Sequence, residues 1–378
     1  MQIPVTYNLR NMRVRRVTTI MTALGTALSV AVLLCVLALV QGLRTSFEGT
    51  GDAQHLLVLR KGATAELMSV VSREGFQVIR SKPGIEMASL ELVTIVDVED
   101  PRVEQMNVNL RGLLPVGFEM RPQIHLMAGR FFRPGSREAV VGKAIADKYK
   151  SARMGQKIFI GRGEWEIVGV VDAGRSAYNS EIFVDLNQLS TDYSRTGFLS
   201  SVLIKPLPGW SNSVRADIEQ DRQLNVFVQS ERDYYAAQTK SSLPVQYMGL
   251  LVAVIMAIGS AFALMNTMYA AVARRSAEVG TLRVLGFSQR QILQSFLLES
   301  LLVAAIGGLL GCLLVLPLND FDTRIGSFQT FSEMAFSFQI TPPVLAIGLA
   351  FSLSIGVIAG MLPAVRAARR EILVALRG

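Results

Sequence analysis

Histidine is scarce in this 378-residue chain, and the motifs of common catalytic sites are missing from it. Its two histidines, His55 and His125, provide no H-E-x-x-H zinc motif and little material for a Ser-His-Asp triad. The phosphate-binding sequence G-x-x-x-x-G-K-S/T does not occur, because Gly142-Lys143 lacks both the upstream glycine and the hydroxyl residue that should follow. We therefore predict no catalytic residues and no nucleotide site in this chain.

Cysteine is equally rare, and the chain contains only Cys35 and Cys312. Both lie inside long apolar segments, so the sequence holds no disulfide framework and no C-x-x-C metal site. We interpret the two cysteines as small packing residues of membrane helices, and we predict no bound metal.

Long apolar segments, in contrast, are abundant. Half of the residues are hydrophobic, 18% are charged, and the mean hydropathy is +0.37. This composition is too apolar for an ordinary soluble protein and too charged for one that lies wholly in a membrane. The predicted fold class is therefore a membrane protein with four transmembrane α-helices, arranged 1+3, and a large α+β extracytoplasmic domain between the first and the second. Spans long enough to cross a bilayer occur at 17–40, 243–269, 292–316 and 344–362.

These spans divide the chain into consecutive predicted segments. In order they are a cytoplasmic amphipathic helix at 1–16, the first span at 17–42, the extracytoplasmic domain at 43–242, the second span at 243–270, a cytoplasmic connector at 271–291, the third span at 292–316, an extracytoplasmic loop at 317–343, the fourth span at 344–362 and a cytoplasmic tail at 363–378.

Basic residues predict the orientation of these segments. Twelve arginines lie before the first span, between the second and third, and after the fourth, where only Glu278 and Glu371 are acidic. By the positive-inside rule both termini and the connector are cytoplasmic, and the large domain is outside. From Arg44 to Lys240 there are 25 basic and 24 acidic residues, so the net charge of +8 reflects membrane topology. No nucleic-acid partner is predicted.

The connector between the second and third spans has the helix-capping residues of an ordered element. A helical run is predicted to continue from the second span past Arg275 to Leu285, where Gly286 takes a left-handed C-terminal cap. Ser288 and Gln291 form a capping box at the start of the next helix. An ordered, basic helix-turn element just outside a membrane is shaped to press on another protein.

Strands and helices interleave in the extracytoplasmic domain without the glycine fingerprint of a nucleotide site. Gly161-Arg162-Gly163 predicts a hairpin. The coarse prediction is an α+β domain of one or two lobes. Its predicted strands lie at 55–60, 90–98, 106–113, 138–142, 157–160, 165–171, 181–184, 201–205 and 225–229, and its predicted helices at 63–81, 143–150 and 211–222.

Residues 231–240 are also predicted to be helical and to extend the second span outward as a stalk, which would link motion of the domain to motion of the span. The alternative is a plain linker.

Small residues recur in the spans at helix-packing spacing, which lets helices approach closely. Four helices are few for a transport path, so a second copy or a related subunit is expected. The spacing does not distinguish contacts within one bundle from contacts in a dimer. The packing candidates are Gly25 and Ser29 in the first span, Gly307 and Gly311 in the third, and Gly348, Ser352, Gly356 and Gly360 in the fourth.

Glu299 is the one acidic residue inside a predicted span. An ionisable group at that depth is costly, so it is a candidate for a proton relay or a pivot pair. It lies only about two helical turns from residue 292. The favoured interpretation is structural, with interfacial water or an arginine of the connector as its partner.

The membrane-flanking sequences resemble those of one transporter family. The connector NTMYAAVARRSAEVGTLRVLGFSQRQI, followed by LLESLLVAAIGGLLG, is similar to the signature of the FtsX-like, MacB-type permeases of ABC transporters. The ending GMLPAVRAARREILVALRG and the start at Leu9-Arg10-Asn11 also look like this family. In the outer domain the resemblance is confined to EAVVGKAIADKY and EWEIVGVV.

The resemblance implies a mechanical function in a bacterial inner membrane, with the large domain in the periplasm. Two permeases, identical or related, would sit on a dimer of separate ATPase subunits that bind ATP and Mg²⁺, and the chain itself would not be an enzyme. Because the sequence starts with a bare amphipathic helix, the ATPase is expected to be another polypeptide. Carried over by position, the residues that would seat in the ATPase are Arg274, Arg275, Glu278, Val279, Gly280, Thr281, Arg283 and Gly286. The arginines have anionic lipid as an alternative partner.

Three functions fit this resemblance. The first is export of a substrate from the outer compartment, with a periplasmic adaptor and an outer-membrane channel as further partners. The second is a lipoprotein-releasing permease. The third is a non-transporting regulator of cell-wall hydrolases, whose outer domain is usually smaller than the one here. The sequence names no substrate and does not separate a homodimer from a heterodimer.

Overall fold

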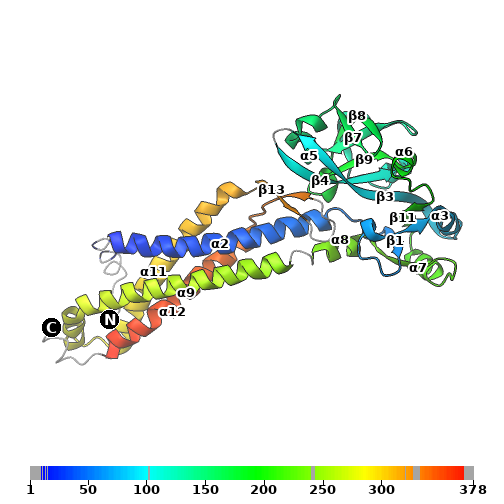
Figure 1. The fold of residues 1–378 in the computed structure, drawn as a ribbon. Coiled ribbons are helices and arrows are strands. Elements are labelled where there is room, and N and C mark those ends of the chain that lie inside the picture. Colours follow the sequence, from blue (N-terminus) through cyan, green and yellow to red (C-terminus); the bar gives the residue numbers. More distant parts are fainter. Residues whose placement is uncertain are drawn as a thin grey trace. The chain divides into compact units, whose positions relative to one another are not determined.

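The computed structural model describes residues 10, 12, 14, 16–100, 103–239, 243–319, 321–326 and 333–369. Contacts divide the chain into two compact units (Figure 1). We call the first the helical unit, which comprises Met1–Gln41, Pro244–Phe321 and Phe338–Gly378. We call the second the sheet domain, which comprises Gly42–Leu243 and Asp322–Ser337. Most of the predicted amphipathic helix and the end of the predicted tail lie outside the described residues.

Within the described residues, four helices are long and apolar enough to cross a membrane, as the sequence predicts. The helix α2 continues to Glu48, several residues beyond the predicted end of the first span and beyond the limit of the helical unit at Gln41. The four are α2 (Arg16–Glu48), α9 (Leu243–Arg274), α11 (Gln289–Val315) and α12 (Pro342–Arg369). The short helix α10 (Ser276–Val284) lies between α9 and α11, and η5 (Leu316–Leu318) follows α11.

The sheet domain is built on one mixed sheet, which confirms the predicted α+β class. Ten described strands form it in the order β12-β1-β11-β3-β4-β9-β6-β8-β5, with β7 paired to β8. The pairs β4–β9 and β6–β8 are parallel and the others are antiparallel. The strands are β1 (Leu56–Arg60), β3 (Ile85–Asp100), β4 (Val103–Leu113), β5 (His125–Gly129), β6 (Glu138–Gly142), β7 (Lys157–Ile160), β8 (Gly163–Asp172), β9 (Glu181–Asp185), β11 (Ser201–Pro206) and β12 (Val226–Ser230).

The long strand β3 joins two halves of this sheet. Its residues 85–91 pair with β11 and its residues 92–100 pair with β4. The two predicted lobes are therefore halves of one continuous sheet that share a strand.

Alternation along the strands separates an apolar face from a polar one. On one face, Leu90, Leu110 and Ile182 join a buried hydrophobic cluster that also includes residues of four short helices. Those helices are α3 (Arg73–Arg80), α5 (Lys143–Lys148), α6 (Leu186–Asp192) and α7 (Ser211–Glu219). Because successive side chains of a strand point to opposite faces, the next residues along, Glu91, Arg111 and Glu181, belong to the other face.

The predicted hairpin at Gly161 is confirmed, since β7 and β8 pair as antiparallel neighbours around it. The predicted helix at 63–81 is wrong. That segment instead forms η1 (Glu66–Met68), β2 (Val71–Ser72) and α3. The strand β2 pairs with β10 (Phe198–Leu199), and the Ser72 hydroxyl caps α3 by accepting a hydrogen bond from Gly75 N, so a long-range pairing overrides the local helical pattern.

Several elements were not predicted. They are β5 and α6, α4 (Pro115–Glu119), η2 (Lys150–Ala152) and η3 (Ala177–Ser180), and a hairpin of β13 (Asp322–Gly326) with β14 (Glu333–Ser337) in the loop between α11 and α12. The hairpin belongs to the sheet domain although it lies far along the sequence. The predicted stalk segment contains α8 (Glu231–Thr239), which the undescribed residues 240–242 separate from α9.

Candidate functional site

The connector contains a break that the sequence analysis missed. The helix α9 ends at Arg274 and α10 begins at Ser276, while Arg275 between them has φ −105° and ψ 20°. The prediction of one continuous helix to Leu285 is therefore wrong at Arg275. The helix α10 is therefore separate from α9.

The turn after α10 follows the predicted chemistry. Gly286 has φ +94°, and the hydrogen bonds Gly286 N to Arg283 O and Phe287 N to Leu282 O form a complete Schellman motif. The predicted capping box at Ser288 and Gln291 is also present. The connector is consequently an ordered helix-turn-helix element.

A buried ion pair ties the break to α11. Arg275 Nη1 donates to Glu299 Oε2 over 2.8 Å, and the two side chains are 9% and 6% exposed. Arg275 Nε also donates to Glu278 Oε2 at 3.3 Å, and the guanidinium lies 5.0 Å from the ring centroid of Phe296. Glu299 thus has a connector arginine as its partner, one of the two partners expected from the sequence.

The other predicted coupling residues divide between surface and interior. Val279 and Gly280 are buried, and Arg283 is half-buried, with Nη1 donating to the carbonyl of Phe287 at 3.2 Å. The exposed members are Arg274, Glu278, Thr281 and Gly286. The sequence analysis overlooked Val284 and Leu285, which are 63% and 69% exposed at the end of α10. An exposed apolar pair beside charged residues gives α10 a surface of mixed chemistry.

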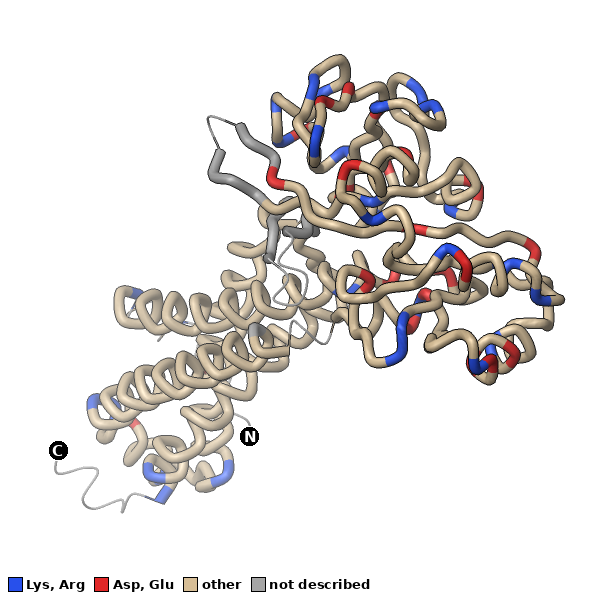
Figure 2. The backbone as a smooth tube through the Cα atoms, turned by 45° about the vertical axis from the view of Figure 1, so that its right-hand side comes forward, with Lys and Arg blue, Asp and Glu red and all other residues tan. Residues whose placement is uncertain are grey.

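The charges of the helical unit gather away from the middle of its helices. Figure 2 shows that the long helices are almost without charged positions along their length. Basic residues lie in the last turns of α9 and α12. Arg274 and Arg366 belong to these ends. This distribution is the one that a bilayer imposes on spanning helices.

The predicted small residues of α11 and α12 contact other helices of the same chain. A Cβ on Gly307 would lie 2.7 Å from Thr26 Cβ, and one on Gly311 would lie 2.7 Å from the carbonyl of Ala27. Positions 348, 356 and 360 are similarly filled by Leu34, Ala304 and Ser300, and Ser352 Oγ lies 2.2 Å from the Cβ position of Gly308. These contacts are all within one chain.

The small residues of α2 behave differently from one another. Ser29 Oγ lies 2.6 Å from Ser260 Oγ of α9, and Ser260 Oγ also donates to the carbonyl of Gly25 at 3.0 Å. Apart from the neighbouring backbone of α2, no atom of the described residues lies within 4 Å of the position that a Cβ of Gly25 would take. The backbone of Gly25 is therefore used in this chain, while its side-chain face is open.

A second group of buried charges lies on the polar face of the sheet domain. We call it the buried charge cluster. Every member is at most 4% exposed, and the members are His55, Glu66, Glu91, Arg111, Arg121, Tyr178, Glu181 and Glu231. Sequence reasoning missed all eight. The available signal was a charged residue inside each of three apolar strands, Glu91 in β3, Arg111 in β4 and Glu181 in β9.

Arg111 is the centre of this cluster. Its guanidinium donates to Glu181 at 2.7 and 3.1 Å, to Glu66 at 3.0 and 3.1 Å, and to Glu91 at 2.8 Å. Arg121 holds both oxygens of Glu91 at 2.6 and 2.9 Å. Four carboxylates and two guanidinium groups are brought together from distant parts of the chain.

The pKa directions within the cluster differ from one carboxyl to the next. Burial raises the pKa of Glu181, and Arg111 offsets that effect only in part. Burial acts in the same direction on Glu91, but Arg121 and Arg111 together outweigh it, so the pKa of Glu91 is lowered. Burial also raises the pKa of Tyr178. Of Glu91 and Glu181, Glu181 is therefore the carboxyl that binds a proton more readily.

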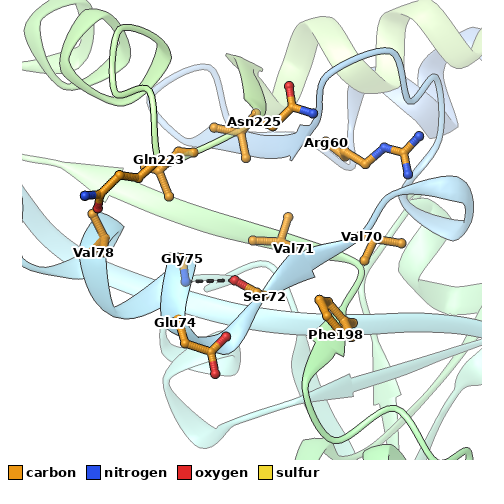
Figure 3. Close-up of a pocket in the computed structure, with 12 residues that line it drawn as sticks. Arg60, Val70, Val71, Ser72, Glu74, Gly75, Val78, Phe198, Gln223 and Asn225 are labelled. Carbon is orange, nitrogen blue, oxygen red and sulfur yellow. Dashed lines mark hydrogen bonds between the residues drawn. The ribbon is translucent and has the colours of Figure 1, made fainter.

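The sheet domain also has a pocket of about 400 Å³, which lies within the usual size of ligand pockets (Figure 3). Val71, Val78, Leu224 and Val226 supply apolar walls. The Ser72 hydroxyl in its lining already caps α3, as the dashed line to Gly75 N shows. None of its lining residues belongs to the buried charge cluster.

Family models match most of the chain. A model of the MacB-like periplasmic core domain matches residues 19–221, and a model of the FtsX-like permease C-terminal region matches residues 250–372. The chain belongs to the family of MacB-type, FtsX-like permeases of ABC transporters. The sequence-based recognition of this family is confirmed.

The relatives of this chain differ in how much of their own length it matches. The chain is 23% identical to the macrolide export ATP-binding/permease protein MacB of Pasteurella multocida, with 96% of this chain and 58% of that protein covered. It is 24% identical to the uncharacterized ABC transporter permease YknZ of Bacillus subtilis, with 95% of this chain and 94% of that protein covered. The chain thus spans little more than half the length of its MacB relative. The periplasmic region of MacB from Actinobacillus actinomycetemcomitans aligns with a TM-score of 0.40 at 10% identity, over 49% of this chain and 92% of that one.

Proposed function

We propose that this permease transmits ATP-driven motion from a separate ATPase dimer to its sheet domain, and that this motion drives export of a substrate from the outer compartment. The observation that carries the proposal is α10, a short ordered helix between two membrane helices. Its exposed surface combines Thr281, Val284 and Leu285 with charged Glu278. A rigid helix with a mixed polar and apolar surface is suited to fit a groove on a partner.

The contacts of α10 support a mechanical role. The Schellman motif around Gly286 fixes the C-terminal end of α10. The Arg275–Glu299 ion pair joins the N-terminal end of α10 to α11. A push on α10 would therefore displace both ends of a stiff element, because neither end is a slack loop. The positive-inside pattern supports a cytoplasmic position for α10 and an outer position for the sheet domain.

The energy source is proposed to be a partner subunit. The sequence contains no phosphate-binding glycine loop, and the YknZ relative, which is matched over 94% of its length, is named as an ABC transporter permease. We therefore place ATP and Mg²⁺ in the partner, and we propose a second permease copy or paralogue in the complete assembly. The close contacts at glycines of α11 and α12 support compact packing of α2, α11 and α12 in each copy.

Charge reversal on α10 tests this proposal. Glu278→Lys and Arg283→Glu, each purified from native membranes, are expected to recover at least about tenfold less P-loop ATPase than the wild-type chain, which corresponds to about 1.4 kcal/mol of association. The matched control is Glu164→Lys, because Glu164 is an exposed carboxylate of the sheet domain at 64% exposure.

Two outcomes would count against the proposal in different ways. Normal ATPase recovery and normal export in both α10 variants would show that α10 is not the contact. Wild-type chain that purifies without any P-loop ATPase, with or without nucleotide, would refute the transporter function as a whole.

A further inference from the structure

The sheet domain has its entrance and its exit at one place. The end of α2 at Glu48 leads into the segment 49–55, and the chain leaves the sheet through α8, which begins at Glu231. Asp52 N donates to Glu231 Oε2 at 3.0 Å, and Glu231 N donates to the carbonyl of His55 at 2.9 Å. The segment 49–55 and α8 are therefore joined to each other directly.

The approach of these two segments is too close for a side chain. A Cβ on Gly51 would lie 2.7 Å from the carbonyl oxygen of Glu231 and 2.8 Å from Arg232 N. Backbone atoms cannot yield as the tip of a side chain can, so glycine is required here. The contact between the entry segment and α8 is consequently a fixed feature of the fold.

Glu231 also connects this contact to the interior of the sheet. Its Oε1 accepts a hydrogen bond from the Tyr178 hydroxyl at 2.8 Å, and that hydroxyl accepts one from Arg121 Nε at 2.8 Å. Arg121 in turn holds Glu91 of β3. An unbroken chain of buried hydrogen bonds thus runs from the first turn of α8 to the strand that joins both halves of the sheet.

A second set of contacts holds the next turn of α8. The Tyr234 hydroxyl accepts a hydrogen bond from Glu66 N at 3.1 Å, and the Tyr235 hydroxyl accepts one from Arg111 Nη2 at 3.4 Å. The two rings meet edge-on with centroids 5.1 Å apart. Both paths end on Arg111, Arg121 and their carboxylates, so α8 has little freedom to slide over the polar face.

We propose that Glu231 is a positioning residue that clamps the entry segment 49–55 and the exit helix α8 to each other and to β3 and β4. A displacement that arrives along α8 then moves the sheet as one body instead of being lost in the connection. This role rests on the transmission function proposed above. It goes beyond that function because it names the residue that holds α8 rigidly against the sheet.

The conservative variant Glu231→Gln tests the clamp in the full-length protein. Glutamine keeps the shape but loses the charge that strengthens the bonds from Tyr178 and Asp52 N. Hydrogen exchange at residues 49–55 and 232–239 is expected to quicken together by about tenfold or more, because both segments lose charge-assisted bonds to one group. The control Asp233→Asn changes an exposed carboxylate on the same helix and should leave exchange unchanged.

A functional readout separates positioning from simple stability. In the reconstituted transporter, Glu231→Gln is expected to export less substrate per ATP hydrolysed, with ATPase association unaffected. Tyr178→Phe removes only one of the hydrogen bonds to Glu231 and should give a weaker version of both effects, which keeps the test usable if Glu231→Gln folds poorly.

The possible failures are distinct. Faster exchange in α8 alone would refute the shared clamp. Faster exchange in both segments with unchanged export per ATP would refute its role in transmission. Loss of ATPase association in Glu278→Lys, observed beside either result, would leave the proposed function standing.

Discussion

The two units of this protein bury charge in opposite ways. The sheet domain holds the eight-residue buried charge cluster in which Arg111 alone contacts three carboxylates. In the helical unit, the described ion pairs are those that Arg275 makes with Glu299 and with the exposed Glu278. Cohesion there comes instead from backbones that approach at glycines such as Gly307 and Gly311.

The difference follows from the solvent of each unit. In water, the sheet domain gains enough from apolar burial to carry costly polar groups, provided that they are hydrogen-bonded. Between helices in lipid there is no comparable hydrophobic force, so close packing of small residues supplies the attraction. The sheet domain can therefore hold a buried network of charges, whereas the described residues of the helical unit contain one buried ion pair, Arg275–Glu299.

The largest expected effect is on the network. Arg111→Met leaves three buried carboxylates without their common partner, so we expect a loss of about 3–5 kcal/mol in the unfolding free energy of the sheet domain. Both tryptophans of the chain, Trp165 and Trp210, lie in this domain, so intrinsic fluorescence during urea unfolding of the full chain reports on it.

The matched control for Arg111→Met is Arg130→Met. Arg130 holds Glu138 at 2.6 Å, but its side chain is 43% exposed. Exposed pairs contribute little, so the urea midpoint should be nearly unchanged. Equal effects of the two substitutions would show that burial does not distinguish the cluster from a surface pair.

An intermediate effect is expected at the single pair of the helical unit. Arg275→Ala leaves one buried carboxylate without its partner rather than three. The loss in the unfolding free energy should therefore be about 3 kcal/mol, the lower end of the range for broken buried pairs. The double variant Arg275→Met with Glu299→Leu should recover most of it, because both charges are then removed. The measurement is loss of the far-ultraviolet helical signal during SDS titration.

The neighbouring Arg274→Ala is the control for this pair, because Arg274 is exposed on the same helix end. A double variant less stable than Arg275→Ala would contradict the interpretation of Arg275 and Glu299 as a self-contained pair.

The smallest effect is the pH dependence of the cluster. The pKa of Glu181 is raised on folding, so the folded domain binds more protons than the unfolded chain between the two pKa values. The contribution of Glu181 to stability is therefore fully present below its pKa in the unfolded chain. It is lost as the pH rises through its higher pKa in the folded domain. Glu181→Gln should flatten this decline, measured as unfolding free energy against pH.

Glu91 is expected to change stability with pH in the opposite direction. Its pKa is lowered, so its contribution is present above the unfolded pKa of about 4.3 and is lost as the pH falls through the folded pKa. If wild-type protein and Glu181→Gln have parallel pH profiles from neutral to mildly acidic pH, Glu181 is not the group that titrates.

The features that the sequence predicts well are local ones. Span length, the cap at Gly286 and the box at Ser288 each depend on a few neighbouring residues, and all appear in the structure. The family signature extends over the connector, which is also a local pattern. Orientation and partners are proposed from the same local evidence.

The missed features depend on residues far apart in sequence. The break at Arg275 is held by Glu299, 24 residues further on, and the network joins Glu66, Arg111 and Glu231 from separate elements. The spacing of residues along the chain does not predict such long-range contacts. Strand alternation identifies which residues share a face of the sheet, as with Glu91 and Arg111, but not which strands become neighbours.

The place of β1 in the sheet also sets an order of events during synthesis. Its neighbours in the sheet are β11 and β12, which begin at Ser201 and Val226, although β1 itself starts at Leu56. The first strand of this sheet to be made therefore waits for the last two before it is paired. Sheets closed by such distant partners fold slowly. A nascent chain of this protein must keep an unpaired apolar strand from aggregating until nearly the whole domain has left the ribosome.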